Sequence, residues 1–259
     1  MKNPYIINTH SHANMLQKTN IDEAIYNAQK ENIITIVPSS SGEDIFDVDK
    51  FIQKYHDVYG YVGVFPEEVK TFTDKTLSEM ETIIKHNKKI IGIGEIGLDY
   101  YWDKTYKELQ KEVFIKQIEF ANQMNFPLNI HSREAHLDTI KILRKYNKNS
   151  TAIMHCFSGS LEFAKECVKE GIYIALGGVV TFKNAIKAKE VAANIPLEYL
   201  LLETDDPYLA PVPFRGKENQ PMYVKYVALE IANLRNTTID EIAKITTQNA
   251  ERIFNFNAK

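Results

Sequence analysis

The sequence contains few cysteines and no excess of basic residues. Its 259 residues include only two cysteines, Cys156 and Cys167, which excludes a disulfide framework and a zinc site built from thiolates. The 31 basic residues are outnumbered by 34 acidic ones, so the formal net charge is −3. This balance argues against sequence-independent binding of a nucleic-acid backbone over a broad surface. Any contact with phosphate is therefore expected to be local.

Long hydrophobic runs are also absent. No stretch approaches the roughly 18 consecutive apolar residues that a membrane span needs. The first residues, MKNPYIINTH, lack the apolar centre of a secretion signal. We therefore expect a cytoplasmic protein without membrane attachment, and no obligatory protein partner is evident. The residues that are present, 44% hydrophobic and 25% charged, have the composition of an ordinary globular protein.

Short apolar runs alternate with amphipathic segments along the whole chain. The runs, which we interpret as strands, cover residues 6–10, 33–39, 59–65, 90–96, 127–132, 150–157, 171–178 and 198–205. The amphipathic segments, interpreted as helices, cover residues 20–32, 47–57, 74–88, 105–124, 134–146, 160–170, 184–194 and 220–235. A last helix at about 238–254 opens with Thr238 and Glu241, the spacing of a capping box. This alternation predicts an α/β fold, a single-domain (β/α)8 TIM barrel spanning residues 1–259.

A doubly wound open sheet is the alternative architecture. It is disfavoured because no G-x-G-x-x-G turn follows the first predicted strand. The run GIGEIG, from Gly92 to Gly97, lies inside a strand pattern and is not a phosphate loop. We interpret its glycines as positions where another part of the backbone approaches closely.

Side chains that bind metals fall at the predicted strand ends, where a barrel collects its catalytic groups. They are His10, His12, Glu95, His131, His155 and Asp205. His10 and His12 point the same way if the first strand continues through them, because successive side chains of a strand alternate between faces. The remaining histidines fall in predicted helices: His56, His86 and His136.

Imidazoles and carboxylates without thiolates suit zinc, manganese or cobalt, with magnesium possible. Six ligands are too many for one tetrahedral zinc ion, and they predict two divalent ions about 3.5–4 Å apart that assist a hydrolytic displacement. Glu95, from a central strand, is the natural bridge between the ions. Asp205 can hold one ion and accept a proton from the attacking water, which makes both carboxylates candidate catalytic groups. Glu203 has the same strand parity as Asp205, and periodicity alone does not choose between them.

Long motifs extend the pattern over nearly the whole chain. They are NTHSH, GIGEIGLDYYWD, LNIHSR, MHCFSGS, GGVVTFKNA and LLETDDPYLAPVPFRGKENQP. In order and spacing they resemble the motifs of the TatD family of metal-dependent hydrolases, in the amidohydrolase superfamily. The resemblance implies a deoxyribonuclease that hydrolyses phosphodiesters at DNA ends or in single strands by a metal-bound hydroxide.

The resemblance also assigns the ligands. It implies that His10, His12, Glu95 and Asp205 hold one ion, and that Glu95, His131 and His155 hold the other. It favours Asp205 as the ligand and leaves Glu203 in a supporting position. Zinc is the first expectation for both ions. An amidase, deacylase or lactonase acting on a small molecule with the same centre remains the alternative, whereas the intact ligand set argues against a binding protein without turnover.

The chain departs from the family pattern at several positions. Asn8 and Asn14 stand where aspartates are frequent, so we expect altered tuning of the ligands and no loss of metal. Phe65 replaces the histidine of the family motif GVHP, which removes a possible proton donor or substrate contact and puts the nuclease rate in doubt. Glu218 stands for a basic residue and Gln220 for an acidic one.

Candidate substrate contacts complete the pattern. Arg133 and Arg215 can bind phosphate through their planar guanidinium groups, although pairing with a nearby carboxylate is an equally open role for each. Ser158 and Gly159 can offer backbone N–H groups to an anion at a helix N-terminus. The aromatic residues 100–102 either stack on a base of a DNA substrate or belong to the core.

Overall fold

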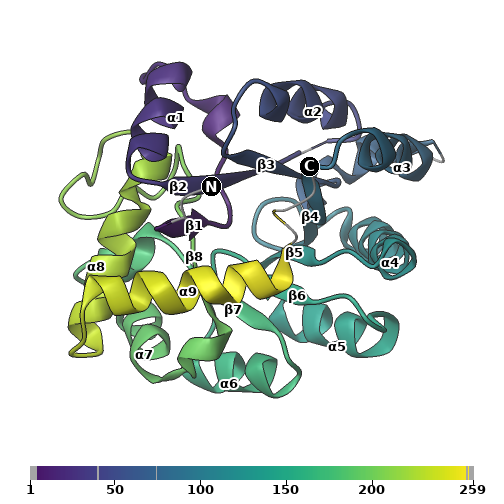
Figure 1. The fold of residues 1–259 in the computed structure, drawn as a ribbon. Helices are drawn as coiled ribbons and strands as arrows, with labels where there is room; N and C mark the ends of the chain where they lie inside the picture. Colours follow the sequence, from purple (N-terminus) through teal and green to yellow (C-terminus); the bar gives the residue numbers. More distant parts are fainter. Residues whose placement is uncertain (1–4, 40, 74, 255, 257–259) are drawn as a thin grey trace. The chain divides into compact units, whose positions relative to one another are not determined.

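Strands and helices alternate along the chain as the sequence predicts. The computed structural model describes residues 5–39, 41–73, 75–254 and 256. Figure 1 shows the succession of strands and helices along the chain. The parallel strands have the order β1 to β8 of a closed barrel. The predicted (β/α)8 TIM barrel is confirmed. The chain divides into two compact units, which are described in turn, and the single domain over residues 1–259 stays a prediction.

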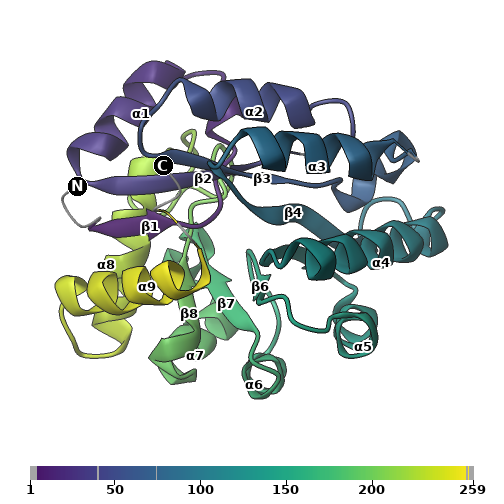
Figure 2. The same cartoon turned by 45° about the vertical axis from the view of Figure 1, so that its right-hand side comes forward.

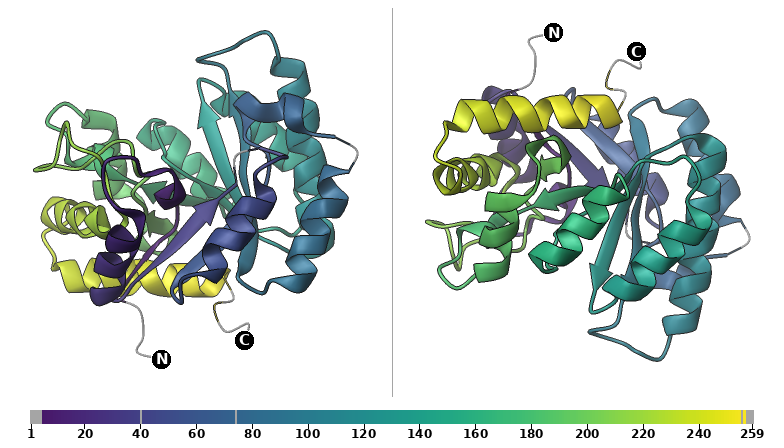
Figure 3. Two further views of the ribbon diagram at one scale, coloured as in Figure 1. Left: turned by 90° about the horizontal axis from the view of Figure 1, so that it is seen from above. Right: turned by 90° about the horizontal axis from the view of Figure 1, so that it is seen from below.

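Unit 1 comprises Met1–Val37, Tyr55–Val58 and His155–Ile253. Its parallel strands pair in the order β7 (Tyr173–Leu176), β8 (Leu200–Leu202), β1 (Ile6–Asn8) and β2 (Ile33–Pro38). Its helices are α1 (Ile21–Lys30), α6 (Leu161–Lys169), α7 (Ile186–Asn194), α8 (Val224–Leu234) and α9 (Ile239–Ile253). Helix α9 lies alongside α8 (Figure 3) and also contacts β1 and β8. The N-terminal helix α1 and the C-terminal helices α6–α9 therefore belong to one unit.

Unit 2 comprises Pro38–Lys54, Tyr59–Met154 and Phe254–Lys259. Its strands pair in parallel in the order β3 (Val58–Val62), β4 (Ile90–Asp99), β5 (Leu128–Arg133) and β6 (Ala152–Met154). Its helices are α2 (Ile45–Gln53), α3 (Thr76–His86), α4 (Lys107–Met124) and α5 (His136–Tyr146). Helix α4 runs along β4 (Figure 2).

Hydrophobic periodicity explains these elements. The strands are buried along almost their whole length, as expected of parallel strands covered on both faces, whereas each helix buries one stripe of apolar residues. Thr238 accepts the N–H of Glu241 at 3.2 Å, so the predicted N-cap of the last helix is confirmed. Among the described residues, no helix has the length and apolar character needed to cross a membrane.

Several element boundaries differ from the predictions. Strand β4 continues to Asp99 and does not stop at residue 96, because it pairs with β5 as far as Asp99 and Arg133. The helix predicted at 47–57 ends at Gln53, so His56 lies in the connection to β3. Strands β1, β6 and β8 are shorter than predicted, and the candidate ligands that follow them lie in loops. The predicted start of the third helix, residue 74, lies outside the described residues.

The interpretation of the GIGEIG glycines is confirmed. A Cβ atom on Gly94 would lie 2.7 Å from the Cβ atom of Asn129, and one on Gly97 would lie 2.0 Å from the carbonyl oxygen of His131. Strands β4 and β5 therefore approach each other more closely than any residue with a side chain would allow.

Candidate metal centre

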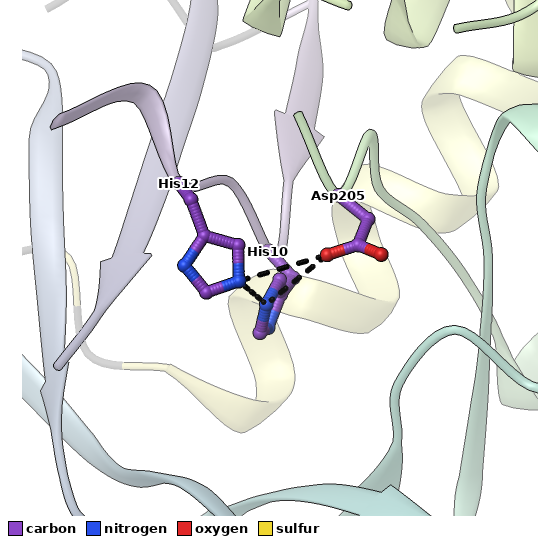
Figure 4. A group of neighbouring side chains, drawn as sticks. All are labelled: His10, His12 and Asp205. Carbon is purple, nitrogen blue, oxygen red and sulfur yellow. Dashed lines mark hydrogen bonds and ion pairs between the residues drawn. The ribbon is translucent and has the colours of Figure 1, made fainter. Parts of the chain in front are cut away.

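Three predicted ligands of unit 1 converge on one point (Figure 4). The Nε2 atoms of His10 and His12 lie 3.0 Å apart. Asp205 Oδ1 lies 3.7 Å from His10 Nε2 and 3.6 Å from His12 Nε2. All three residues come from loops just beyond β1 and β8. Both histidines are buried, and the Asp205 side chain keeps 15% of its surface exposed, so that solvent can reach the group.

The spacing of these donor atoms fits a metal ion. Donors held at about 2.0–2.1 Å by one tetrahedral zinc ion lie roughly 3.3–3.4 Å from one another. The observed separations of 3.0, 3.6 and 3.7 Å fall on both sides of this value. Two imidazole nitrogens and one carboxylate oxygen are also the donor types that zinc, manganese and cobalt accept.

Backbone hydrogen bonds between the two loops position this group. The carbonyl oxygen of His10 accepts the N–H of Asp205 at 3.1 Å, and the N–H of His12 donates to the carbonyl oxygen of Asp206 at 2.8 Å. Asp205 adopts a left-handed backbone conformation with φ 55°, which aspartate tolerates better than most residues. The left-handed turn, and not continued strand alternation, aims its carboxylate at the two histidines.

His155 and Glu203 lie beside this group in unit 1. The His155 ring stacks on the His10 ring with centroids 3.9 Å apart. Glu203 is fully buried, and its Oε1 atom lies 3.6 Å from His155 Nδ1 and accepts the N–H of Cys156 at 2.5 Å. Glu203 therefore faces His155, whereas Asp205 faces His10 and His12. The structure therefore distinguishes the positions of Glu203 and Asp205, which have the same strand parity in the sequence.

Asn8, the last residue of β1, is hydrogen-bonded to the loop that carries Asp205. Its side chain donates to Thr204 Oγ1 at 2.8 Å and accepts the N–H of Thr204 at 3.0 Å. Thr204 in turn hydrogen-bonds the carboxylate of Asp206. Burial raises the pKa of Asp206 to about 6. Asn8, which stands where aspartate is frequent in the family motif, therefore has a structural role as a hydrogen-bonding group.

The predicted ligands of unit 2 form a second group. His131 Nδ1 lies 3.0 Å from Glu95 Oε1, and His131 Nε2 lies 2.8 Å from Asp99 Oδ2. When the Nε2–H donates to Asp99, the lone pair of Nδ1 faces Glu95. A carboxylate behind a histidine in this way fixes the ring and raises its basicity as a metal ligand.

Asp99 belongs to the candidate site through its contact with His131, although it is not among the site residues predicted from the sequence. It shares strand parity with Glu95, and this signal was present in the sequence, but the predicted strand stopped before it. Burial alone would raise the pKa of Asp99, but hydrogen bonds from His131 and from the N–H groups of Tyr101 and Trp102 outweigh it, and the pKa is lowered. An ionised Asp99 is the acceptor that His131 needs.

Phe65 lies directly against this second group. Its ring meets the His131 ring edge to face, with centroids 4.8 Å apart and an interplanar angle of 76°. The position where the family motif carries a histidine therefore supplies an apolar wall to His131 and no proton donor.

The predicted substrate contacts have different surroundings. Arg133 lies over the Tyr101 ring, 3.9 Å from its centroid, and Arg215 lies 3.8 Å from the centroid of Phe182. Within the described part of the chain, neither arginine forms an ion pair with a carboxylate. Ser158 is exposed and precedes Ser160, the N-cap of α6. Phosphate binding by these residues stays a prediction.

The residues of the aromatic cluster separate into two environments. Tyr100 is buried, with 8% of its surface exposed, and its hydroxyl donates to Asp138 at 2.9 Å. Tyr101 and Trp102 are 46% and 62% exposed. Core packing is therefore the role of Tyr100 only.

Comparison with known proteins identifies the class and the family. The family model described as TatD related DNase matches residues 7–255. The metal-dependent hydrolase YabD of Bacillus subtilis is 44% identical over 255 residues, covering 97% of this chain and all of the relative. The crystal structure of YjjV, a TatD homolog from Escherichia coli, superposes with a TM-score of 0.90 at 30% identity, covering 96% of this chain and 98% of that one. A TatD family hydrolase from Entamoeba histolytica shares the fold, with a TM-score of 0.86 at 19% identity over 97% of this chain and 98% of that one.

The barrel and its groups of histidines and carboxylates define a metal-dependent hydrolase. Within this class, the chain belongs to the TatD family.

Proposed function

We propose that this hydrolase is a deoxyribonuclease that cleaves phosphodiester bonds at DNA ends or in single strands. The convergence of His10 Nε2, His12 Nε2 and Asp205 Oδ1 carries the proposal, because it is a donor set for a divalent ion at a point that water can reach. The description of the matching family, TatD related DNase, supports DNA as the substrate.

We assign the ligands as the family resemblance implies. His10, His12, Glu95 and Asp205 would hold one ion, and Glu95, His131 and His155 would hold the other. Zinc is the first choice for both ions, with manganese, cobalt or magnesium as alternatives. When bound, such ions draw negative charge from phosphate oxygens and lower the pKa of water, which supplies a nucleophile at neutral pH.

The chain's own residues prepare the substrate and move the proton. Asp205 is exposed enough to contact water, and its carboxylate accepts the proton of the attacking molecule. Asp99 holds the His131 ring in place. Arg133 and Arg215, which form no ion pair with a carboxylate among the described residues, offer guanidinium groups to phosphate, and Ser158 offers its backbone N–H. The low cysteine content, two in 259 residues, favours the reducing cytoplasm as the place of this activity.

Metal analysis and cleavage of a labelled single-stranded oligonucleotide test the proposal. We expect about two ions per chain and cleavage that a chelator abolishes. Asp205→Asn and Glu95→Gln should lower the rate at least roughly 100-fold, the scale of one lost proton-transfer or charge-stabilising group. Asp47→Asn is the matched control, because the Asp47 carboxylate is 75% exposed on α2 and pairs only with Lys50 among the described residues. Equal activity in the three variants would reveal a contaminating nuclease and refute the proposal.

Hydrolysis of a small ester, amide or lactone is the second candidate. The contact of Phe65 with His131 favours it, because an apolar wall beside the ligand suits a less charged substrate than DNA. Two ions per chain, no cleavage of DNA, and turnover of such a substrate that Asp205→Asn abolishes would establish this candidate in place of the first.

A further inference from the structure

The loop that follows β4 exposes two large aromatic side chains beside an arginine. The Tyr101 and Trp102 rings are nearly perpendicular, with centroids 4.8 Å apart and an interplanar angle of 84°. The Arg133 guanidinium carbon lies 3.9 Å from the Tyr101 centroid and 5.3 Å from the Trp102 centroid. We propose that these three residues, the stacking platform, bind an unpaired base of single-stranded DNA while Arg133 contacts the adjoining phosphate. The proposal rests on the proposed function and names the part of the substrate that is recognised.

Packing does not account for the exposed rings. The preceding residue, Tyr100, already fills the core position of this loop and bonds to Asp138. Tyr101 and Trp102 remain 46% and 62% exposed, although burying a large ring is strongly favourable. An exposed indole is a surface on which any base can stack, because every base has a π face.

A single carboxylate ties the platform to the second ligand group. Asp99 Oδ1 accepts the N–H groups of Tyr101 at 2.8 Å and Trp102 at 3.3 Å. The other oxygen, Oδ2, lies 2.8 Å from His131 Nε2. The N–H of Tyr100 also donates to the carbonyl oxygen of Arg133 at 2.9 Å. A base held on the platform is therefore held at a fixed place relative to His131.

Charge around the platform suits an anionic strand of limited length. The loop sequence YYWDKTYK interleaves aromatic and basic residues with one acidic residue, Asp103, whose charge acts on Lys70. The Glu67 carboxylate is also near enough to Arg133 for their charges to interact. Lys107 lies over the Tyr100 ring at 4.2 Å and Lys70 over the Tyr106 ring at 3.8 Å. Lys104 is balanced by Glu134 at 3.9 Å. The overall charge of −3 is unfavourable for broad binding of a phosphate backbone, so only a few basic groups near the platform can contact phosphate. Base stacking must therefore contribute to binding together with these phosphate contacts.

Trp102 is the only tryptophan of the chain, so its fluorescence reports directly on the platform. In the experiment, a single-stranded thymidine oligonucleotide is titrated into the 259-residue chain. A chelator is present to prevent cleavage. An abasic oligonucleotide of the same length and charge is the comparison. We expect saturable quenching of Trp102 by the thymidine strand, and roughly 10-fold weaker binding of the abasic strand.

Variants separate stacking from a structural role. With a labelled thymidine strand and anisotropy as the readout, Trp102→Ala should weaken binding roughly 10-fold, whereas Trp102→Phe keeps a π face and should restore most of the affinity. Tyr26→Ala is the matched control, because Tyr26 is also an exposed ring, 55% exposed on α1, with Lys30 over it at 4.6 Å. Equal affinity for thymidine and abasic strands, or unchanged affinity in Trp102→Ala, would overturn the proposal.

The experiments distinguish an incorrect stacking platform from an incorrect proposed function. If the metal-loaded protein cleaves DNA but Trp102 does not respond to bases, the platform is refuted and the nuclease stands. If the thymidine strand quenches Trp102 and the abasic strand does not, while no phosphodiester is cleaved, the platform is supported and the nuclease is refuted.

Discussion

Replacing Gly97 by alanine tests how β4 and β5 hold the second ligand group. Gly97 pairs with His131 in the strand register and has φ +141°, a conformation that only glycine adopts readily. A Cβ atom there would lie 2.0 Å from the carbonyl oxygen of His131, whereas ordinary contact begins at 3.4 Å. The strands would have to separate by about 1.4 Å at this pair, the difference between these distances, and neighbouring parallel strands are only about 4.8 Å apart.

The magnitude follows from two contributions. The backbone conformation costs about 1–3 kcal/mol for a residue other than glycine. Separating the strands weakens the pairing of Ile96 with Ile130 and of Leu98 with Ser132, where each buried group left without a partner costs about 1–3 kcal/mol. With one group lost at each of these two pairs, we expect Gly97→Ala to lower the free energy of unfolding by about 3–9 kcal/mol, a large part of the roughly 5–15 kcal/mol of a typical domain.

Urea unfolding followed by circular dichroism measures this loss, with Gly171→Ala as the matched control. Gly171 also has a positive φ, +74°, but nothing lies within 4 Å of the point that a Cβ atom would occupy, so alanine there costs only about 1 kcal/mol of backbone strain. Metal content should fall in Gly97→Ala and not in Gly171→Ala, because only the first change displaces His131. Stabilities within about 1 kcal/mol of each other would refute the steric reasoning.

Three further predictions concern other tertiary contacts. The Glu218 carboxylate accepts backbone N–H groups of residues 17–19 through four contacts of 2.7–3.0 Å, so Glu218→Gln should cost about 1 kcal/mol in urea unfolding at pH 7. Burial raises the pKa of the Glu218 carboxyl, but these hydrogen bonds outweigh burial, so the pKa in the folded protein lies below 4.5. The difference in stability between wild type and Glu218→Gln should therefore persist at neutral pH and shrink as the pH falls through this folded-state pKa. Gln117→Met should cost about 2–4 kcal/mol in the same assay, because the buried Gln117 amide bonds both the N–H and the carbonyl of Val64. Phe65→His should raise the rate of oligonucleotide cleavage by roughly 10-fold or more, because it places a proton donor beside His131.

Each of these predictions has a contradicting result. A Glu218→Gln difference that grows on acidification would mean that the carboxylate is not held ionised by the loop. Gln53→Met, at an exposed amide on α2, should change the stability little, and an equal loss there would contradict the burial argument for Gln117. An unchanged cleavage rate in Phe65→His, with metal content retained, would remove residue 65 from the chemistry.

Local patterns of the sequence were sufficient for the fold and for the grouping of several candidate ligand residues. The alternation of apolar runs and amphipathic segments predicted all the strands and helices to within a few residues, because periodic burial is encoded within each segment. The pair His10 and His12 was correctly brought together with Asp205, since the loops after parallel strands meet at one edge of the sheet.

Strand alternation failed where the backbone leaves the strand. Strand β8 ends at Leu202, and the left-handed turn at Asp205 sends Glu203 and Asp205 to different histidines. Strand β4, in contrast, continues beyond its predicted end because β5 pairs with it, and this brings Asp99 behind His131. Neither outcome is visible in the residues of one segment, because each depends on a partner strand or loop.

The sequence by itself determined the barrel, the chemical types of the ligands and the family, because hydrophobic period, residue type and motif spacing are local properties. The tertiary structure decided which carboxylate meets which histidine, which aromatic rings remain exposed, and how Glu218 is held by a loop 200 residues away. The physical reason is that hydrogen bonds and close contacts between distant segments exist only after the backbone has fixed their distances.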